Sequence, residues 1–555
     1  MTAATMLRSR GMRTEVPSPG AGIDGLRLVV VLVLCFSFVL PVAAVISLAL
    51  NPGAMAQVLT RSVLVATWHS IVTAGVSAVL AIVIGALLVL LLDRSDVRGR
   101  GGLRLLFLSP FLVPPFIGAI AWIGLLGPQG TISGLLDRVF GWSELPFSIY
   151  GAGGIIALLT IHSYPIAYIV ISAAMKRIPA SLEEASLIAG APRSRTMVSI
   201  TMPLLRPTLI AAFTLCAVSN LSDFGIPALL GLQVNYYTLA TLIYRFLVAG
   251  VVDDPLGVSS SIGLALLLLA VGAVVLQRKI SGTIRLDPTG ERVGTLHTGG
   301  LRLPCTVIAW LAAAGFALLP LLSLAQQSLR PAPGVPLTWK TATLDNFVEI
   351  VRYPGAISGV VNSVTLSIGA ALICGVVGLT IGSLITRTRA RSNLFLDIGS
   401  TLPQSMPGLV IGIGWIIAGI WVGVYGTRWV LLFAYVTAFT ALVVQAVRGP
   451  LSDADPSLEE AARISGAGGL RTLLDVTWRA AVPAALSGMV LVALTAVREL
   501  TISVLLASPG NRTLGVVIFD LQQSGSYSAA ASLALLVTIV GLLGLGIVAG
   551  SSRRD

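Results

Sequence analysis

The sequence predicts an all-α membrane protein with about twelve transmembrane helices, arranged as two six-helix repeats that have the same orientation. Its composition is the first indication: 55% of the 555 residues are hydrophobic, 11% are charged, and the mean hydropathy is +0.92. Soluble domains carry about 25% charged residues. The low charge therefore favours a chain that is embedded in a lipid bilayer.

Twelve apolar runs support this helix count, because a helix needs about 20 mainly apolar residues to cross a bilayer. The first six runs lie at 28–50, 67–92, 104–126, 151–175, 208–231 and 257–277. The second six lie at 303–325, 361–386, 395–421, 429–447, 482–506 and 529–549. Each run is a predicted transmembrane helix.

The basic residues orient these helices. With the N-terminus inside, the predicted inside segments contain 27 of the 36 Lys and Arg residues, as the positive-inside rule requires. An even number of spans then places both termini in the cytoplasm. Because this topology accounts for the net charge of +12, we expect no nucleic-acid partner.

The two halves of the sequence repeat each other. In the third predicted helix, two prolines and a tryptophan recur 293 residues apart, as Pro110, Pro114 and Trp122, and as Pro403, Pro407 and Trp415. The segment Ser181–Ala185 recurs 276 residues further on as Ser457–Ala461. Six helices per repeat is an even number, so both halves have the same orientation. This implies a pseudo-two-fold axis along the membrane normal, with a path between the halves.

The repeat divides the chain into two halves and a connection. Residues 1–277 form the first half, with a docking loop at about 176–207, and residues 303–555 form the second, with a docking loop at about 448–481. The basic, glycine-containing stretch 278–302 is the predicted cytoplasmic linker. The repeat offset is 293 residues at the third helix and 276 at the docking loop. The first half is therefore 17 residues longer than the second between these two features.

The two loops have matched sequences. In each, a proline precedes a Ser-x-x-Glu segment, Ser181–Glu184 or Ser457–Glu460, which predicts a capping box at the start of a short helix. Gly190 and Gly466 follow at equivalent positions and predict a helix end in the left-handed conformation. Each loop is therefore expected to form a short helix, a sharp turn and a second short helix, open to close contact with another protein.

These loops resemble the EAA motif of binding-protein-dependent ABC importer permeases. The first copy consists of Glu184-Ala185-Ser186, Gly190, Ile200 and Met202-Pro203. The second consists of Glu460-Ala461-Ala462, Gly466 and Val476, with Trp478-Arg479 in place of the usual Leu-Pro pair. The order of helices around both loops extends the resemblance over nearly the whole chain.

The resemblance implies the type I ABC importer permease fold in a bacterial plasma (inner) membrane. It also implies two partners, a cytoplasmic ATPase dimer that binds one loop per subunit and an extracytoplasmic substrate-binding protein. The ATPase-docking residues that carry over are Glu184, Ala185, Ser186 and Gly190, with Glu460, Ala461, Ala462 and Gly466.

The chain itself has no motif for ATP hydrolysis. A Walker A loop needs a Gly-Lys pair, and the three lysines, Lys176, Lys279 and Lys340, follow methionine, arginine and tryptophan. We therefore predict a permease that is not an enzyme and has neither catalytic residues nor a cofactor. Three histidines and four scattered cysteines indicate no metal site.

Polar and ionisable residues inside apolar spans are costly and mark candidate functional positions. Asp223 and the Arg498-Glu499 pair occupy equivalent positions in the fifth helix of each half, and Asn220 lies in the polar stretch before Asp223. These four residues are the pathway candidates near the axis. The alternative is that the charges pair with one another and only hold the bundle together. His69 and His162 are further buried candidates.

The cargo is indicated by resemblance alone. Asp223-Phe224-Gly225, Asn362-Ser363 and the fused architecture resemble the ferric-iron subgroup of these permeases. Thiamine and aminophosphonate permeases have similar fused forms and stay alternatives. The outside segment 327–358 is either part of a platform for the binding protein or an ordinary loop. A stand-alone secondary transporter is the alternative from another class, although it would not explain two Ser-x-x-Glu loops.

Overall fold

The computed structural model describes residues 21–141, 147–250, 252–281 and 299–551, with the backbone alone for 542–551. All regular structure in these ranges is helical. Ten of the described helices are long and apolar enough to cross a membrane, or up to twelve if each of two bent helix pairs is one span. The predicted all-α fold is confirmed. Of the predicted linker, residues 282–298 lie outside the described ranges.

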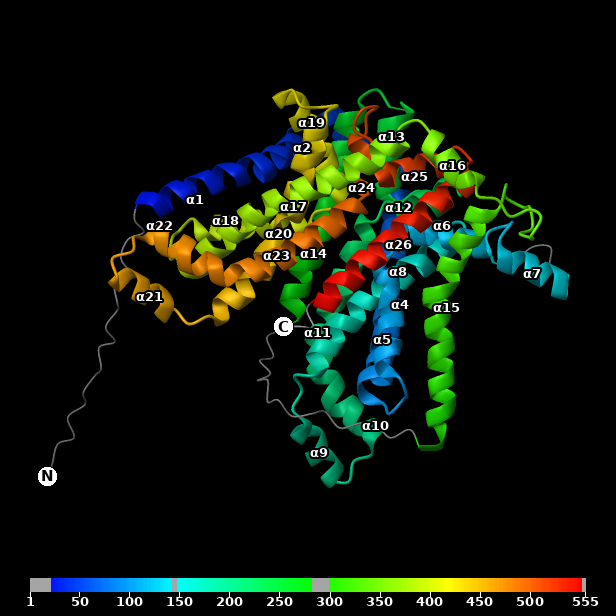
Figure 1. Ribbon diagram of the computed structural model, residues 1–555, viewed down its shortest axis with the longest axis horizontal. Helices are drawn as coiled ribbons and strands as arrows, with labels where there is room; N and C mark the ends of the chain where they lie inside the picture. Colours follow the sequence, from blue (N-terminus) through cyan, green and yellow to red (C-terminus); the bar gives the residue numbers. More distant parts are fainter. Residues whose placement is uncertain (1–20, 142–146, 251, 282–298, 552–555) are drawn as a thin grey trace.

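The helices of the first half follow one another from residue 21 to residue 280 (Figure 1). They are α1 (Ala21–Leu34), α2 (Leu40–Ala49), α3 (Pro52–Val58), α4 (Arg61–Val89), α5 (Arg100–Leu108), α6 (Pro115–Leu126), α7 (Thr131–Phe140), α8 (Ala152–Met175), α9 (Ala180–Ile188), α10 (Arg193–Thr196), α11 (Met202–Ser222), α12 (Gly225–Gly231), α13 (Leu239–Ala249) and α14 (Pro255–Ile280).

The second half repeats this order, without a described counterpart of α7. Its helices are α15 (Arg302–Leu329), α16 (Asp345–Arg352), α17 (Ala356–Arg387), α18 (Asn393–Thr401), α19 (Gly408–Val422), α20 (Arg428–Asp453), α21 (Ser457–Ile464), α22 (Gly469–Thr472), α23 (Trp478–Val497), α24 (Thr501–Leu506), α25 (Leu514–Gln523) and α26 (Tyr527–Ser551). Helices α17, α20 and α23 are therefore the counterparts of α4, α8 and α11.

The third predicted helix of each half is broken rather than continuous. The run 104–126 becomes α5 and α6, with the 3-10 turn η3 (Ser109–Leu112) between them. Pro110 lies in this turn, and Val113 before Pro114 is extended, with ψ of 131°. Proline lacks an N–H group and disfavours helical backbone in the preceding residue. In the second half the equivalent break bends the chain by 112°.

The fifth predicted helix of each half ends earlier than its apolar run. Helix α11 ends at Ser222, where Asp223 is extended with ψ of 128°, and α23 ends at Val497. Two short helices follow each break, α12 and α13 or α24 and α25, and α13 is buried only in its first half. The sequence analysis missed α13 and α25 because helices of 11 and 10 residues are too short to cross a bilayer.

The first long helix of each half packs against the other half. Helix α2 lies along α19 as well as α14, while α15 lies along α5 and α6 as well as α26. The pairs α4–α8 and α17–α20 form the centre of each half. The two halves of the sequence are thus interlocked in space, each holding a helix of the other.

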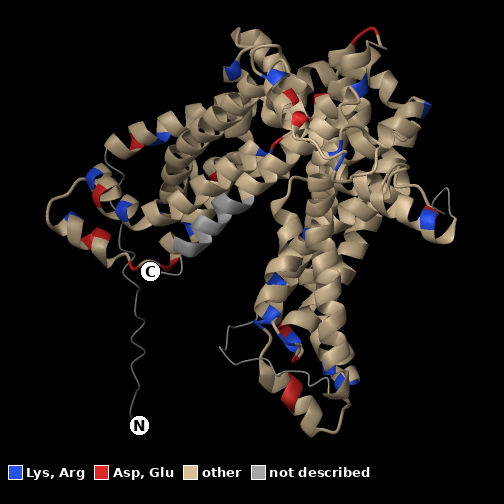
Figure 2. Cartoon of the chain, turned by 45° about the vertical axis from the view of Figure 1, so that its right-hand side comes forward, with Lys and Arg blue, Asp and Glu red and all other residues tan. Residues whose placement is uncertain are grey.

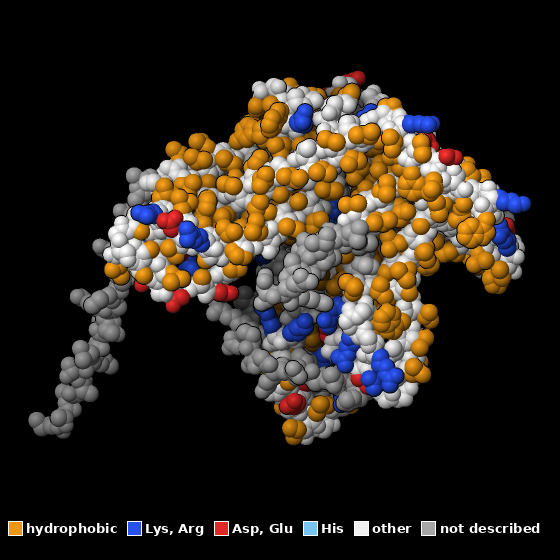
Figure 3. All heavy atoms as spheres, in the orientation of Figure 1, with side chains coloured by type: hydrophobic (Ala, Val, Ile, Leu, Met, Phe, Trp, Pro, Cys, Tyr) orange, Lys and Arg blue, Asp and Glu red, His pale blue; other side chains and the backbone are white. Residues whose placement is uncertain are grey.

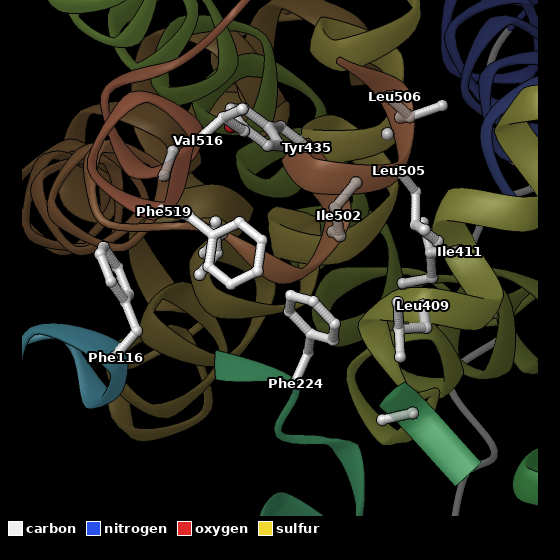
Figure 4. Close-up of a cluster of buried hydrophobic side chains, with 14 of the residues drawn as sticks. Phe116, Phe224, Leu409, Ile411, Tyr435, Ile502, Leu505, Leu506, Val516 and Phe519 are labelled. Atoms are coloured by element: carbon white, nitrogen blue, oxygen red, sulfur yellow. The ribbon is translucent and has the colours of Figure 1, made fainter. Parts of the chain in front are cut away.

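The halves meet in an apolar core at the pseudo-two-fold axis (Figure 4). Tyr244 and Phe519 are equivalent because each lies six residues after the threonine N-cap of its helix, α13 or α25, and their ring centroids lie 6.0 Å from each other. Equivalent residues can touch across a two-fold only beside the axis. Phe224, directly after the break in α11, packs on both rings at 5.0 and 5.6 Å. The breaks in the fifth helices therefore lie close to the axis.

Charged and apolar surfaces are separated along the molecule. Hydrophobic side chains cover much of the upper body (Figure 3), and α4 and α17 expose apolar residues on their outer faces. Two legs extend from this body and carry α9 and α21 (Figure 1). Lysine, arginine and acidic residues gather at the ends of both legs (Figure 2). This pattern suits a membrane-embedded body with two exposed legs.

The contact between α4 and α8 predicts a stability effect. A Cβ added at Gly85 would lie 2.8 Å from the Tyr168 backbone nitrogen, so Gly85→Ala should force the helices apart and destabilise by about 1–3 kcal/mol. Gly75→Ala is the matched control, because nothing lies within 4 Å of an added Cβ there. That change should be neutral or stabilising. Thermal unfolding in detergent measures both, and equal stability would contradict the packing.

Candidate functional site

Two exposed loops with matched geometry lie at the ends of the legs. In the first, Gly190 has φ of +83°, and the N–H of Ala191 donates to the carbonyl of Ser186 at 3.0 Å. In the second, Gly466 has φ of +87° and the equivalent bond is also 3.0 Å. This bond is typical of a glycine-terminated helix. Since α10 and α22 follow the turns, the predicted helix, turn and second helix are all present.

The predicted capping boxes are wrong. Helix α9 begins at Ala180, before Ser181, and α21 begins at Ser457 itself. The N-cap residue of each helix is a proline, Pro179 or Pro456, and neither cap has a side-chain hydrogen bond. Because each serine lies within its helix and not before the first helical residue, it cannot act as the N-cap.

A buried ion pair attaches the first loop to the body. Glu183, which precedes the Glu-Ala-Ser triplet, accepts hydrogen bonds from both Arg94 Nη atoms, at 3.0 and 2.5 Å. The hydroxyl of Thr201 donates to the same carboxylate at 2.7 Å. Arg94 ends the π-helical turn that continues α4, and Thr201 ends the π-helical turn before α11. One carboxylate thus joins the docking loop to two long helices.

The second loop has a related arrangement, in which the arginine approaches the carboxylate through Nε and not through both Nη atoms. Glu459 lies 3.0 Å from Nε of Arg387, and the hydroxyl of Thr477 donates to Glu459 at 2.8 Å. Arg387 ends α17, and Thr477 ends the π-helical turn before α23. These residues lie 276 or 293 positions after their counterparts, the two offsets of the internal repeat. We call the two sets, Arg94–Glu183–Thr201 and Arg387–Glu459–Thr477, the loop anchors.

The first anchor keeps its carboxylate charged. Burial raises the pKa of Glu183, but the hydrogen bonds from Arg94 and Thr201 and the Arg94 charge outweigh burial and hold the pKa below its ordinary value. The Arg94 and Glu183 side chains are only 5% and 11% exposed. Removing one partner of a buried ion pair typically costs about 3–5 kcal/mol. The anchor therefore resists any separation of the loop from α4.

The residues predicted from the EAA motif lie on the outer side of each loop. Those that are exposed are Glu184, Ala185, Gly190, Glu460, Ala461 and Gly466, and those that are half-buried are Ser186 and Ala462. The structure adds Ile188 and Ile464, which are equivalent residues and both 87% exposed. Sequence reasoning missed this pair because an isoleucine in a short helix is usually turned inward. Its recurrence at the offset of 276 was the available signal.

Two of the pathway candidates have structural partners beside the axis. The side-chain amide of Asn220 donates to the hydroxyl oxygens of Ser77 and Ser163, at 2.8 and 3.2 Å, and so connects α11 to α4 and α8. Asp223 accepts a hydrogen bond from the backbone N–H of Ile226 at 2.9 Å. Asp223 therefore satisfies a free N–H group at the start of α12.

Glu499 has the same role at the start of α24, where it accepts hydrogen bonds from the N–H groups of Ile502 and Ser503 at 2.7 and 3.0 Å. The structural equivalence of Asp223 and Glu499 is thus close. Their carboxylates accept hydrogen bonds from backbone N–H groups that the breaks in the fifth helices leave free. Whether a solute also contacts them stays a prediction.

Arg498 connects the two halves. Its guanidinium donates to the carbonyls of Phe111 and Leu112 in the first half, at 3.2 and 3.3 Å, and lies over the Phe111 ring at 5.9 Å. These are its contacts within the described ranges, where no ion pair joins it to Asp223. The break in the first half supplies the free carbonyls that Arg498 binds.

The described histidines and cysteines lie apart from one another. Among the described residues, no group of three or more His, Cys, Asp or Glu side chains is placed to hold a metal ion. Nδ1 of His69 lies 2.9 Å from the carbonyl of Tyr237, and its ring stacks on Tyr236 at 3.8 Å. His162 stacks on Phe111 at 6.3 Å. Both rings have packing partners.

Comparisons with known proteins agree with this duplicated architecture. The model of the family described as "Binding-protein-dependent transport system inner membrane component" matches residues 81–285 and again residues 375–554. Each matched segment contains one docking loop and one complete loop anchor. Together the two segments cover more than half of the chain.

Full-length relatives match as well. A ferric transport system permease protein of Actinobacillus pleuropneumoniae is 25% identical over 93% of this chain and 76% of its own length. A probable ABC transporter permease protein of Sinorhizobium fredii is 25% identical over 91% of this chain and 90% of its own. An Fe(3+)-transport system permease protein of Haemophilus influenzae is 23% identical over 83% and 84%. With its two fused halves and apolar helices, the chain is a multi-pass membrane protein that belongs to the family of inner-membrane components of binding-protein-dependent transport systems.

Proposed function

We propose that this chain is the permease of an ATP-driven importer that carries ferric iron across the bacterial plasma membrane. In this proposal the two legs face the cytoplasm and each binds one subunit of an ATPase dimer. An extracytoplasmic binding protein delivers the cargo to the opposite side. The observation that carries the proposal is the pair of equivalent exposed loops, each fixed to its own half by a buried anchor.

The exposed face of each loop suits a protein partner. Ile188 and Ile464 present apolar surface beside small residues such as Ala185 and Ala461. Exposed apolar residues that recur at equivalent positions are typical of an interaction site. Burying one isoleucine side chain contributes about 1.5–3 kcal/mol. We infer that these isoleucines enter matching grooves, one on each ATPase subunit.

The anchors suit the transmission of force. Each docking helix is tied through a buried carboxylate to one helix before it and one helix after it in the chain. When the ATPase subunits approach each other, the loops would carry α4 and α11 with them in one half and α17 and α23 in the other. The interlocked first helices and the core at the axis would serve as the fulcrum.

The cargo assignment depends on the relatives. Two of the similar permeases are named for ferric or Fe(3+) transport, and the chain aligns with them over most of its length. The described residues offer no cluster of metal ligands, so selection of iron would belong to the binding protein. Thiamine and aminophosphonate are the competing cargoes.

Docking predicts a clear effect of charge at the loop tips. Ile188→Asp and Ile464→Asp should each weaken binding of the ATPase at least tenfold, because a carboxylate replaces a buried side chain worth about 1.5–3 kcal/mol. Co-purification and a binding titration in detergent measure this loss. Ile188→Leu and Ile464→Leu are the matched controls and should bind normally. Unchanged binding by both aspartate variants would refute the docking surface.

The anchor predicts a different phenotype. Arg94→Gln leaves Glu183 charged and unpaired, which should cost about 3–5 kcal/mol and loosen the loop, so that ATP hydrolysis continues while uptake falls. The double variant with Glu183→Gln should regain much of the thermal stability but not the uptake.

Arg448→Gln is the control for this experiment, because the Arg448–Asp397 pair is 38% exposed on both sides and such pairs contribute at most about 1 kcal/mol. Reconstituted ATPase and uptake assays, with thermal unfolding, compare the variants. Equal effects of Arg94→Gln and Arg448→Gln would refute the special role of the anchor.

The cargo is tested in proteoliposomes that contain the permease, its ATPase and its binding protein. We expect ATP-dependent accumulation of radiolabelled ferric iron, together with ferric iron bound to the purified binding protein. Uptake of thiamine or an aminophosphonate in the same vesicles, without uptake of iron, would contradict the iron assignment and leave the docking proposal intact.

A further inference from the structure

A polar cavity lies at the end of the molecule away from the two docking loops, where α6, α15, α25 and α26 meet (Figure 1). Its volume is about 240 Å³. Both halves of the chain contribute to its wall. The polar side chains in the wall are Gln129, Tyr150, Gln327, Arg330, Gln522 and Tyr527. None of them belongs to the docking loops, the anchors or the central contact.

Arg330 brings an unopposed positive charge to this wall. Its Nε is buried and has no hydrogen-bond partner within the described ranges. Burial lowers the pKa of Arg330. The residue is nevertheless held in place, because the side-chain amide of Asn346 donates to the carbonyls of Ser328 and Arg330 at 2.8 and 2.7 Å. Buried N–H groups are normally paired, so the guanidinium of Arg330 is incompletely satisfied within the described ranges.

Gln522 is a second unsatisfied group in the same wall. Only 5% of the residue is exposed, and its Oε1 has no hydrogen-bond partner among the described residues. The other atom of this amide, Nε2, is a donor and is not buried in the same way, so Gln522 can offer the cavity a donor. The hydroxyls of Tyr150 and Tyr527 are additional donors. The described residues of the wall are thus rich in donors and include one cation and no anion.

We propose that this cavity binds an oxyanion group, a carboxylate or a phosphate, on the side of the membrane where the binding protein docks. A guanidinium donates two parallel hydrogen bonds to such a group, and the amide and hydroxyl groups can bind its remaining oxygens. Because Tyr150 and Gln522 come from different halves, the bound anion would also connect the halves. Only the side of the membrane depends on the proposed function, and the binding itself does not.

Inorganic phosphate is the probe, titrated calorimetrically into the full chain in a phosphate-free detergent against chloride at equal ionic strength. We expect saturable binding that becomes at least tenfold weaker in Arg330→Gln, because a hydrogen bond to a charged group is lost. Gln522→Leu should also bind phosphate more weakly. Arg352→Gln, which changes an exposed arginine at the end of α16, is the matched control and should bind normally.

Two results would overturn the proposal: no saturable binding by the unchanged chain, as for a cavity that holds only water, or equal affinities of the unchanged chain and Arg330→Gln. If Arg330→Gln does not fold, an unchanged affinity in Gln522→Leu overturns it instead. The titration is repeated in nanodiscs that contain phosphatidylglycerol. Loss of phosphate binding there identifies a lipid headgroup as the source of the anion, and retained binding identifies a soluble one. Since neither iron nor ATP is present, failure here is separate from failure of the transport proposal.

Discussion

A carboxylate can be buried only where positive charge and hydrogen bonds compensate for the lost water, and both docking loops are organised by this constraint. Glu183 and Glu459 are turned into the protein, and each meets an arginine at the end of one long helix and a threonine just before another. A docking helix cannot tilt away from these helices without unpairing a charge in a buried place. Each loop is therefore a rigid extension of its own half.

The sequence predicted those features that arise from local patterns. The lengths of the apolar runs predicted the long helices. Gly190 and Gly466 predicted the turns, because only glycine adopts the left-handed conformation without strain. The prediction of capping boxes was wrong even though Ser-x-x-Glu is also a local pattern. The helices begin directly after Pro179 and Pro456, so the serines lie within the helices and not at their caps. The glutamates were then free for contacts that a local pattern does not specify.

The anchors escaped prediction because their members are far apart in the chain. Arg94 and Glu183 are separated by 89 residues, and Arg94 and Arg387 had been counted with the basic residues that set the topology. The signal was nevertheless present. These two arginines recur at the offset of 293, like the prolines of the third helices, while ordinary loop charges need no fixed offset. The short helices α13 and α25 escaped because helices of that length depend on tertiary packing, here mainly against α14 and α4 or against α26 and α17.

The relation between the halves explains how rigid loops can produce movement. Equivalent aromatic residues touch at the axis, Arg498 of one half binds free carbonyls of the other, and the first long helices are exchanged. These contacts lie in the body, far from the ends of the legs (Figure 1). In the proposed function, a small tilt of the halves about these contacts would change the separation of the loops while the body stays closed.

Distances between spin labels test the central claim most directly, in a chain whose four native cysteines are replaced. One pair of labels, at Ala185 and Arg98, lies within the first half, and a second pair, at Ala185 and Ala461, joins the two loops. With the ATPase bound, addition of ATP should shift the distance between the loops. The distribution of distances within the half should stay narrow and keep the same mean. A shift or broadening within the half as large as that between the loops would contradict the account.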